Sequence, residues 1–472
     1  MTSRTLLLNQ RIKELDILRY ECTEIGLGRL FTDLYGSEIR YEPEENKFFT
    51  FSYKAGIWKT CTQAAIERMV LKFLSKDCHK MIRRITDETK KQNYERWIDH
   101  QQTNGAIYGI IKSVKRQKGI ETLKRQFGLN PKLFALKNGV LNLETMEVEQ
   151  GRREDLITKQ ANVYYDDGVT DSTWSNFLRS ISGESEEMYE YLLRKIAYTM
   201  QGNSIEHCLF LLYGKRTRNG KSTYVNGLAF FFGDYSTTLQ PQSLSKNRVC
   251  RAGNANPDIL KLKGARFVNI AEADHNLKLD AAIIKTLTGQ DRVSARGLYK
   301  DYEEFINQAV FYMHVNRLPQ VDDATLFSSN RVIVIPFDQY FGDQTADRSL
   351  PEKLIQRKAL SGLLNEIIRV MKKYKGIPIK ANLPKPVIRE TENYEKNCDY
   401  IGWFLKHRLI KHTGAWTRMK FIYDEYVPFA ELCGHEPLAS GYFTKELHAR
   451  GYETREHGVG NGLMGYKIKS KI

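Results

Sequence analysis

The sequence predicts an α/β protein built around a parallel β-sheet, with smaller domains before and after it. Between residues 206 and 340, short and continuously apolar runs alternate with polar stretches; the runs are CLFLLY, RFVNIA, AVFYMHV and RVIVIPF. Strands that are apolar on both faces suit a parallel sheet buried between layers of helices. The first run also leads directly into a polar, glycine-punctuated loop, which is how a strand of such a sheet often gives way to a helix.

Length and charge narrow the possible classes of protein. At 472 residues the chain is longer than one hydrophobic core usually supports, so we expect several structural units. It has 72 Lys and Arg against 56 Asp and Glu, and the net charge of +16 favours polyanionic partners such as nucleic acid. Half of that charge, +8, falls in residues 72–125. This cluster fits a solvated helical face as well as it fits a binding surface.

The cysteines and the apolar runs predict a location in the cell. Seven cysteines are scattered along the chain with no C-x-x-C pair, which predicts reduced thiols in a cytoplasm-like compartment. No apolar run approaches the ~18 residues of a membrane span, and the start of the chain turns charged too soon for a signal peptide. We therefore expect a cytoplasmic protein without a membrane partner.

Changes of pattern predict five segments. We expect an α+β domain that could bind DNA over residues 1–130, then a hairpin and a helix over 131–205. The sheet domain with a closing helix follows over 206–376 and a proline-rich linker over 377–395. The last segment, 396–472, is expected to be a helix–helix–hairpin domain of the winged-helix kind. The hairpin is LKNGVLNLETMEVEQG, which alternates apolar and polar residues about a turn. The linker holds three prolines within nine residues, and proline neither continues a helix nor donates to a strand ladder.

Residues 211–224, LLYGKRTRNGKSTY, have the composition of a phosphate-binding loop. Such a loop needs backbone N–H groups around the anion, a glycine where a side chain would block the approach, a lysine for the terminal phosphates and a hydroxyl for Mg²⁺. Gly220, Lys221 and Ser222 meet the last three requirements. The spacing is unusual, because Gly214 and Gly220 enclose five residues where four are the norm.

Three later strands carry residues suited to nucleotide hydrolysis at their ends. RFVNIAEAD ends in Glu272 and Asp274, where a nucleotide hydrolase places the carboxylate that holds Mg²⁺. FYMHVNRLP contains Asn316, whose amide could form a hydrogen bond with the γ-phosphate. Arg331 is the first residue of RVIVIPF and comes directly before its apolar residues. Each has a structural alternative, since Glu272 could cap a helix, Asn316 could shape a turn and Arg331 could pair with a surface carboxylate. Their order and their distances from Lys221 favour the functional interpretation.

With these motifs the sequence resembles the superfamily three helicases, in particular the poxvirus-type primase-helicase family found in phages, plasmids and mobile islands. The matching stretches are YGKRTRNGKST, LKGARFVNIAEAD, IIKTLTGQDRVSARGLYKDYEEF, FYMHVNRLP and RVIVIPF, and the resemblance covers roughly residues 130–472. It implies an AAA+ P-loop ATPase core, a helical collar for oligomerisation and a C-terminal winged-helix domain. It also implies a ring, usually a hexamer, that moves 3′ to 5′ along single-stranded DNA in the cytoplasm of a bacterial host.

The resemblance further implies ATP and Mg²⁺ as cofactors and assigns roles to single residues. ATP would be bound by Gly214, Asn219, Gly220, Lys221, Ser222 and Thr223. Mg²⁺ would be held by Ser222 with Glu272 or Asp274, and Ala273 between the two acids leaves open which one serves the metal. Asn316 would be the sensor, and Arg331 would act across a subunit interface.

Two further sets of residues are candidates for DNA contact. RVSARGLYKDYEEF is expected to form a hairpin, with Lys300 near its tip and Arg296 in support. In the predicted helix near the C-terminus, Lys445, His448 and Arg450 could enter a major groove. A solvated hairpin tip and a protein-docking domain are the alternatives for these two sets.

We therefore expect an ATP-dependent, ring-forming DNA helicase that starts replication of a mobile genetic element, with single-stranded and duplex DNA, further copies of itself and a separate primase or loader as partners. Residues 1–130 contain no D-x-D pair and are too few for a polymerising domain, so primer synthesis is not expected. The alternative, from a different class, is a DNA-binding regulator whose nucleotide site is a switch and not a motor.

Overall fold

In the computed structural model the chain divides into two units. The structure describes residues 3–203, 205–246, 256–271, 277–297, 301–321, 323, 325–458 and 460–469. The first unit holds the described residues up to Asp171 together with Phe230–Tyr235 and Ile355–Lys372, and the second holds the others. Within the described ranges, no helix has both the length and the apolar character that crossing a membrane requires.

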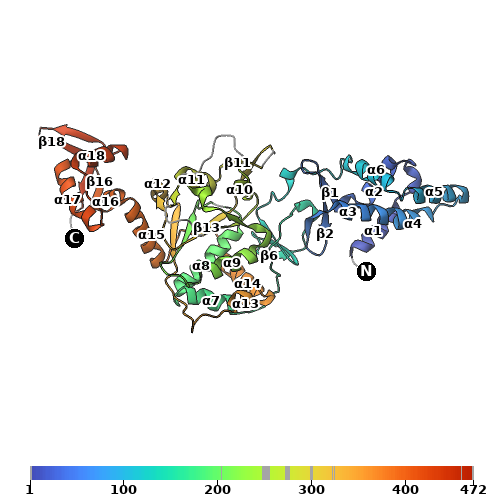
Figure 1. Ribbon diagram of the computed structural model, residues 1–472, viewed down its shortest axis with the longest axis horizontal. Coiled ribbons are helices and arrows are strands. Elements are labelled where there is room, and N and C mark those ends of the chain that lie inside the picture. Colours follow the sequence, from blue (N-terminus) through green and yellow to red (C-terminus); the bar gives the residue numbers. More distant parts are fainter. Residues whose placement is uncertain are drawn as a thin grey trace. The chain divides into compact units, whose positions relative to one another are not determined.

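The first unit begins with a layer of helices (Figure 1). They are α1 (Ser3–Glu14), α2 (Glu24–Tyr35), α3 (Gln63–Lys72), the π-helical segment η3 (Phe73–Cys78), α4 (His79–Ile82), α5 (Glu88–His100) and α6 (Asn104–Lys115). Four of them start at a side chain that accepts a hydrogen bond from the first turn; these caps are Thr23, Thr62, Asp87 and Thr103. The helices bury a common apolar core that includes Phe31, Phe73 and Ile110.

Two small antiparallel sheets complete this unit. The first is β1 (Ile39–Glu42), β2 (Lys47–Ser52) and β3 (Ile57–Cys61), and the second is β4 (Leu133–Leu136), β5 (Gly139–Asn142) and β6 (Glu147–Glu149). The pairing of β5 with β6 confirms the predicted hairpin. The predicted segment 131–205 is divided between the two units. Ala135 and Val140 of the hairpin are buried together with Ala55 and Ile57, so the hairpin belongs to the first, N-terminal unit.

The second unit is built on a five-stranded, fully parallel sheet. Its strands are β7 (Leu209–Tyr213), β8 (Ser236–Leu239), β9 (Phe267–Ile270), β13 (Val310–Val315) and β15 (Val332–Pro336), in the order β15-β7-β13-β9-β8. All four neighbouring pairs run parallel. The four apolar runs of the sequence are therefore confirmed as buried parallel strands. The strand before the glycine-rich loop, β7, lies between β13 and β15.

Helices and short strands surround this sheet (Figure 1). They are α7 (Thr173–Ile181), α8 (Glu186–Met200), α9 (Lys221–Phe232), α10 (Pro257–Leu260), β10 (Lys278–Leu279), α11 (Ala281–Thr288), β11 (Arg292–Arg296), β12 (Tyr302–Ile306), β14 (Gln320–Val321), α12 (Thr325–Ser328) and α13 (Leu350–Leu354). The antiparallel pair of β11 with β12 gives the predicted hairpin in its described residues. The closing helix, α14 (Arg357–Lys373), buries most of its apolar residues, and its Ser361 Oγ donates to Tyr164 O at 2.8 Å.

The predicted proline-rich linker over 377–395 is wrong from Lys385 onward, because a helix, α15 (Lys385–Cys398), forms there. Pro384 is the residue before this helix, and Pro386 lies in its first turn. Backbone N–H groups of the first turn have no acceptor within the helix, so a proline there costs no hydrogen bond. Tyr394 is buried and its hydroxyl donates to Pro319 O at 2.6 Å. The prolines therefore start a packed helix.

The C-terminal residues form an α-β-α-α-β-β domain with a core of its own. Its elements are α16 (Tyr400–Arg408), β16 (Leu409–Arg418), α17 (Met419–Leu432), α18 (Ser440–Ala449), β17 (Thr454–His457) and β18 (Gly460–Ile468), with the antiparallel order β16-β18-β17. Phe404, Tyr426 and Phe443 meet in the core, where the rings of Tyr426 and Phe443 stack at 4.1 Å. The two helices and the glycine-rich hairpin predicted for this region are present.

Candidate functional site

The glycine-rich loop begins at the carboxyl edge of the parallel sheet. Tyr213 ends β7 and lies opposite Val315, which ends the neighbouring strand β13. Because the two strands are parallel and in register, the residues that follow them, Gly214 and Asn316, leave the sheet side by side. Ligands of open α/β sheets bind at this edge, beyond the carboxyl ends of the strands.

The ammonium of Lys221 is held between these two strand ends. Its Nζ donates to the carbonyl oxygens of Gly214 and Val315 at 3.0 Å each and to Asn316 Oδ1 at 2.6 Å. Lys221 is only 5% exposed. The structure therefore brings together two of the predicted site residues, Lys221 at the start of α9 and Asn316 directly after β13.

The loop before Lys221 depends on backbone conformations and close contacts that few residues allow. Gly220 has a φ of +83°, which disfavours a side chain, and a Cβ there would lie 2.7 Å from Ile181 Cγ2. Asn219 is 4% exposed and closes the loop on itself, since its Nδ2 donates to Arg216 O at 2.7 Å. A Cβ on Gly214 would collide with the Asn219 side chain. Both glycines and Asn219 are thus required by the shape of the loop.

The donor set fits a triphosphate and its metal ion. Ser222 and Thr223 occupy the first turn of α9, where backbone N–H groups have no intrahelical acceptor and the helix dipole favours an anion. A buried ammonium beside that helix start suits the terminal phosphates, and the exposed Ser222 carries a hydroxyl oxygen, a type of ligand that Mg²⁺ can bind. Glu272, Asp274 and Lys300 lie outside the described residues.

Arg331 lies at the opposite edge of the same sheet. Its carbonyl oxygen accepts from Leu209 N at 2.7 Å, at the amino end of β7. Tyr213 is four residues further along that strand, which at ~3.3 Å per residue is roughly 13 Å. Arg331 Nη1 donates to Thr288 Oγ1 at 2.9 Å and to Lys285 O at 3.3 Å, both on α11. Within one chain Arg331 is therefore directed at α11 and does not reach Lys221.

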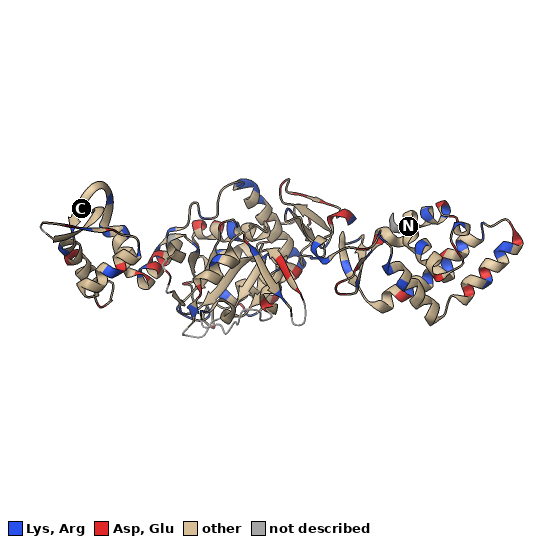
Figure 2. Ribbon diagram, turned by 90° about the horizontal axis from the view of Figure 1, so that it is seen from above, with Lys and Arg blue, Asp and Glu red and all other residues tan. Residues whose placement is uncertain are grey.

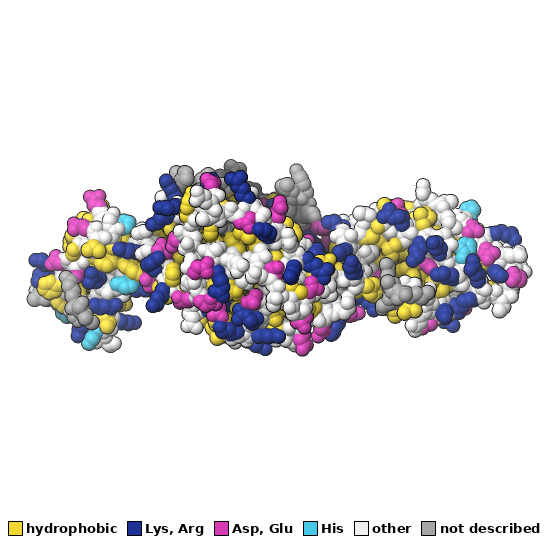
Figure 3. Space-filling model, turned by 90° about the horizontal axis from the view of Figure 1, so that it is seen from below, with side chains coloured by type: hydrophobic (Ala, Val, Ile, Leu, Met, Phe, Trp, Pro, Cys, Tyr) yellow, Lys and Arg dark blue, Asp and Glu magenta, His cyan; other side chains and the backbone are white. Residues whose placement is uncertain are grey.

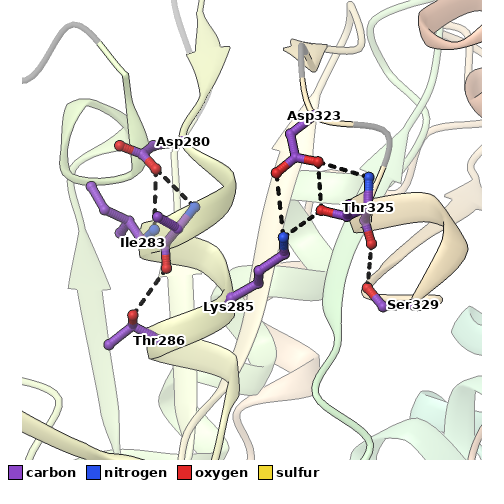
Figure 4. Close-up of polar contacts among 8 residues, drawn as sticks. Asp280, Ile283, Lys285, Thr286, Asp323, Thr325 and Ser329 are labelled. Atoms are coloured by element: carbon purple, nitrogen blue, oxygen red, sulfur yellow. Dashed lines mark hydrogen bonds and ion pairs between the residues drawn. The ribbon is translucent and has the colours of Figure 1, made fainter. Parts of the chain in front are cut away.

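A polar cluster fixes α11 beside the helix that leads to Arg331 (Figure 4). Lys285 Nζ lies 3.3 Å from Asp323 Oδ2 and donates to the Thr325 hydroxyl at the start of α12. Burial alone would raise the pKa of Asp323, but hydrogen bonds from Thr325 and Lys285 outweigh it and lower the pKa. Asp280 caps α11 at its other end, accepting from Ile283 N at 3.2 Å. The surroundings of Arg331 are thus held by charged hydrogen bonds.

The predicted DNA-contact residues are spread over two elements. Arg296 ends β11, and its guanidinium lies 5.2 Å from the ring centre of Tyr302. On and after α18, Lys445 Nζ lies 5.5 Å from the ring centre of Tyr442, and His448 Nε2 lies 2.8 Å from Thr454 Oγ1.

Arg450 differs from its neighbours because it is bound within its domain. Its Nη2 lies 2.8 Å from Asp399 Oδ1 and 2.9 Å from Glu446 Oε1, and its side chain is 24% exposed. Asp399 also caps α16 by accepting from Gly402 N at 3.0 Å. Arg450 therefore joins the ends of α16 and α18, whereas Lys445 extends from the surface of α18.

Lys195 is a residue that sequence reasoning misses. The helical stripe of α8 identifies its apolar positions as buried, and the structure confirms Tyr189, Leu192, Leu193, Ile196 and Met200 in that role. Lys195 is buried as well, at 0% exposure, and its Nζ has no hydrogen-bond partner among the described residues. No local signal identifies it, because a lysine on a helix with an apolar stripe is ordinarily assigned to the solvent-facing side.

Three aromatic rings surround the Lys195 amine. Its Nζ lies 4.5 Å from the ring centre of Tyr312, 5.0 Å from that of Tyr224 and 5.6 Å from that of Phe210. Tyr224 is one turn beyond Lys221 on α9, and Tyr312 is on β13, the strand that ends before Asn316. Burial lowers the pKa of Lys195 well below its ordinary value. The amine thus packs against both elements that carry the site.

Comparison with known proteins relates most of this chain to viral helicases. Residues 28–183 match the family described as "D5 N terminal like", and residues 212–331 match a family of unknown function, DUF5906. "Putative helicase L207/L206" of Acanthamoeba polyphaga mimivirus is 27% identical over 329 residues, 64% of this chain. "Putative helicase 184R" of Invertebrate iridescent virus 6 is 27% identical over 331 residues, 68% of this chain. The chain is a sequence relative of viral proteins named as helicases.

These viral relatives are much longer proteins. The chain spans about a third of each, 33% of the mimivirus protein and 32% of the iridescent virus protein. "Putative helicase 022R" of Frog virus 3 is 30% identical over 155 residues, 32% of this chain and 16% of that protein. Among solved structures, the NrS-1 C terminal region aligns with a TM-score of 0.49 at 11% identity, over 94% of this chain and 100% of that one.

We expect replacement of Lys195 by Met to remove a pH-dependent destabilisation. The folded-state pKa of Lys195 is low, so between that pKa and the ordinary value of about 10.4 the unfolded chain binds a proton that the folded chain does not. Wild-type stability should therefore rise with pH in this window, by up to about 1.4 kcal/mol per pH unit. Lys195→Met should be more stable near neutral pH and lack this slope.

Urea unfolding at several pH values measures both quantities. Lys358→Met is the control, because Lys358 is exposed and its substitution should leave the pH dependence as in the wild type. If the curves of Lys195→Met and wild type run parallel, Lys195 keeps an ordinary pKa and the account of its burial is wrong.

We expect Asp399→Ala and Arg450→Ala each to destabilise the C-terminal domain by about 1–3 kcal/mol, because each breaks a partly buried ion pair and the first also removes a helix cap. Thermal unfolding of the single variants and of the double variant measures the coupling between them. The double variant should cost less than the sum of the two. Lys445→Ala, at an exposed position, should stay within about 0.5 kcal/mol; strictly additive costs for Asp399 and Arg450 would contradict the pairing.

Proposed function

We propose that this chain is an ATP-driven DNA helicase with an AAA+ core. The observation that carries the proposal is the contact of Lys221 with Asn316 at the carboxyl edge of a parallel sheet in which β7 lies between β13 and β15. A motor needs a residue that senses the terminal phosphate beside the lysine that binds it, and these two side chains meet that need. The similarity to viral proteins named as helicases supports DNA as the track.

ATP and Mg²⁺ are the proposed cofactors. Gly220 and the first turn of α9 would supply backbone N–H groups to the phosphates, and Lys221 would neutralise the β and γ phosphates. Ser222 would ligate Mg²⁺ together with Glu272 or Asp274. Bound Mg²⁺ would polarise the terminal phosphate; this chain's own residues orient the nucleotide and keep its terminal phosphate beside Asn316.

A ring of identical subunits, proposed as a hexamer, would complete each site. Arg331 is too far from Lys221 in the same chain, since the two lie at opposite edges of the sheet. A guanidinium that acts on a γ-phosphate from that position must come from a neighbouring copy. The site is therefore proposed to be incomplete in a single chain.

The remaining features of the proposed helicase concern its DNA and its setting. Translocation would run 3′ to 5′, with the β11–β12 hairpin following the single strand. The C-terminal domain, proposed as a winged helix, would bind duplex DNA at an origin through Lys445 and His448, because Arg450 is bound to Asp399 and Glu446. The chain would act in replication of a phage, plasmid or mobile island, beside a separate primase or loader.

We expect ATPase activity that single-stranded DNA stimulates and that Lys221→Ala abolishes. Loss of the ammonium should lower the turnover number by about 100-fold or more, because charge that develops on the phosphates is no longer neutralised. Phosphate release with and without an oligonucleotide measures this, and Lys353→Ala is the control at an exposed lysine. A wild-type chain that binds ATP without turning it over would contradict the motor and indicate a nucleotide-dependent switch.

We expect Arg331→Ala to inhibit wild-type subunits in mixtures. If Arg331 acts at the nucleotide site of the neighbouring subunit, each variant subunit inactivates the site of its neighbour. An equal mixture of variant and wild-type subunits should therefore unwind a forked duplex at much less than half the wild-type rate. Forks with a 3′ or a 5′ tail report polarity in the same assay. Loss in strict proportion to the variant fraction would count against an arginine that acts between subunits.

A further inference from the structure

A row of cations follows one helix of the N-terminal unit. The elements α3, η3 and α4 form one continuous helix from Gln63 to Ile82. Its exposed basic residues recur at a spacing of four, and Arg83 directly follows the helix; the row consists of Arg68, Lys72, Lys76, Lys80 and Arg83. In Figure 2 basic positions recur along the helices of this unit, and Figure 3 shows several groups of Lys and Arg side chains, with Asp and Glu among them, on the face that it displays.

A spacing of four keeps the row on one face because the helix contains a π-helical segment. In an α-helix of 3.6 residues per turn, four residues rotate by about 40° more than a full turn, so the three steps from Arg68 to Lys80 would drift by about 120°. A π-helical turn contains more residues and offsets part of this drift. Here the π-helical segment η3 lies in the middle of the row.

The buried side of the same helix confirms that residues four apart share a face. Ile66, Val70, Leu74, Cys78 and Ile82 are spaced by four across the whole helix, and each is 0% exposed. Four of the five cations, Arg68, Lys72, Lys76 and Lys80, lie two residues further along, which is about 200° of rotation. They therefore stay on the outer face from one end of the helix to the other.

Little negative charge balances this row. Lys72, Lys76 and Arg83 make no ion pair with any described residue, and Lys80 lies 3.4 Å from Asp77, whose side chain is 1% exposed. Asp77 also accepts a hydrogen bond from Tyr35, so it belongs to the interior. Exposed cations in a row repel one another, and a polyanion that lies along them relieves this repulsion and releases its counterions.

The chemistry of the face favours the backbone of duplex DNA. Four residues of helix rise by about 6 Å, so the cations form a regular line that can meet successive phosphates. The uncharged residues exposed between them, Leu71 and Ser75, include no aromatic ring on which unpaired bases could stack. Contacts to phosphates alone carry no sequence information.

We propose that the row from Arg68 to Arg83 is a sequence-independent binding surface for duplex DNA. The inference rests on the proposed function only in taking DNA as the nucleic acid that this chain meets. It gives the N-terminal unit a task distinct from that of the parallel-sheet site: holding the duplex while another part of the protein acts on the single strand.

The test is the salt dependence of duplex binding by the full chain. Wild type is compared with a variant in which Lys72, Lys76, Lys80 and Arg83 are changed to Gln, which keeps helix propensity while removing charge. The control changes the same residue types at exposed positions of the same unit, namely Lys54, Lys59, Lys90 and Arg96. Fluorescence anisotropy with a labelled duplex of mixed sequence gives the affinity at each salt concentration, and circular dichroism checks the fold of both variants.

Each lost phosphate contact should reduce the magnitude of the slope of log affinity against log salt by about 0.9. The slope of the row variant should therefore be smaller by up to about 3.6, whereas the slope of the control variant should stay near that of the wild type. Equal slopes in the two variants would overturn the proposal. ATP turnover measured in the same samples separates this proposal from the proposed function. If the wild type turns over ATP but does not bind duplex DNA, only the proposed DNA-binding row is rejected. If the row variant has the reduced slope but the wild type does not turn over ATP, only the proposed motor is rejected.

Discussion

The hydrogen bonds of the Lys221 ammonium are the interaction on which the site depends. They require that β7 and β13 be neighbours, parallel and in register, so that the carbonyl oxygens of Gly214 and Val315 and the amide of Asn316 converge on one point. A slip of one residue in that pairing would turn alternate side chains to the other face and remove the convergence. The chemistry of the site is therefore a property of sheet topology, and the loop completes it.

Two departures from ordinary stability rules lie beside the same two strands. Gly220 adopts a positive φ, and Lys195 places an amine without a hydrogen-bond partner among aromatic rings that belong to β7, β13 and α9. Buried unpaired groups and unusual backbone conformations are costly, and proteins keep them mainly where function requires them. By contrast, Arg331 and Arg450 show ordinary pairing with neighbours in their own domains.

Features that depend on a local sequence pattern can be predicted from the sequence. Apolar runs identified the buried strands, and the loop from Gly214 to Ser222 was recognisable from its composition. Strand order and the approach of Asn316 to Lys221 needed the fold, because no local pattern encodes which parallel strands are neighbours. The helix after Pro384 was missed because proline at a helix start resembles proline in a linker. The pairing of Arg450 with Asp399 was hidden because the two residues are far apart along the chain.

An experimental structure with Mg²⁺ and a non-hydrolysable ATP analogue tests the central claim most directly. The account predicts that the terminal phosphates lie within hydrogen-bonding distance of Lys221 Nζ and Asn316, with the first turn of α9 directed at them. Nucleotide bound elsewhere on the chain, with the Lys221 ammonium still bonded to Gly214, Val315 and Asn316, would contradict it.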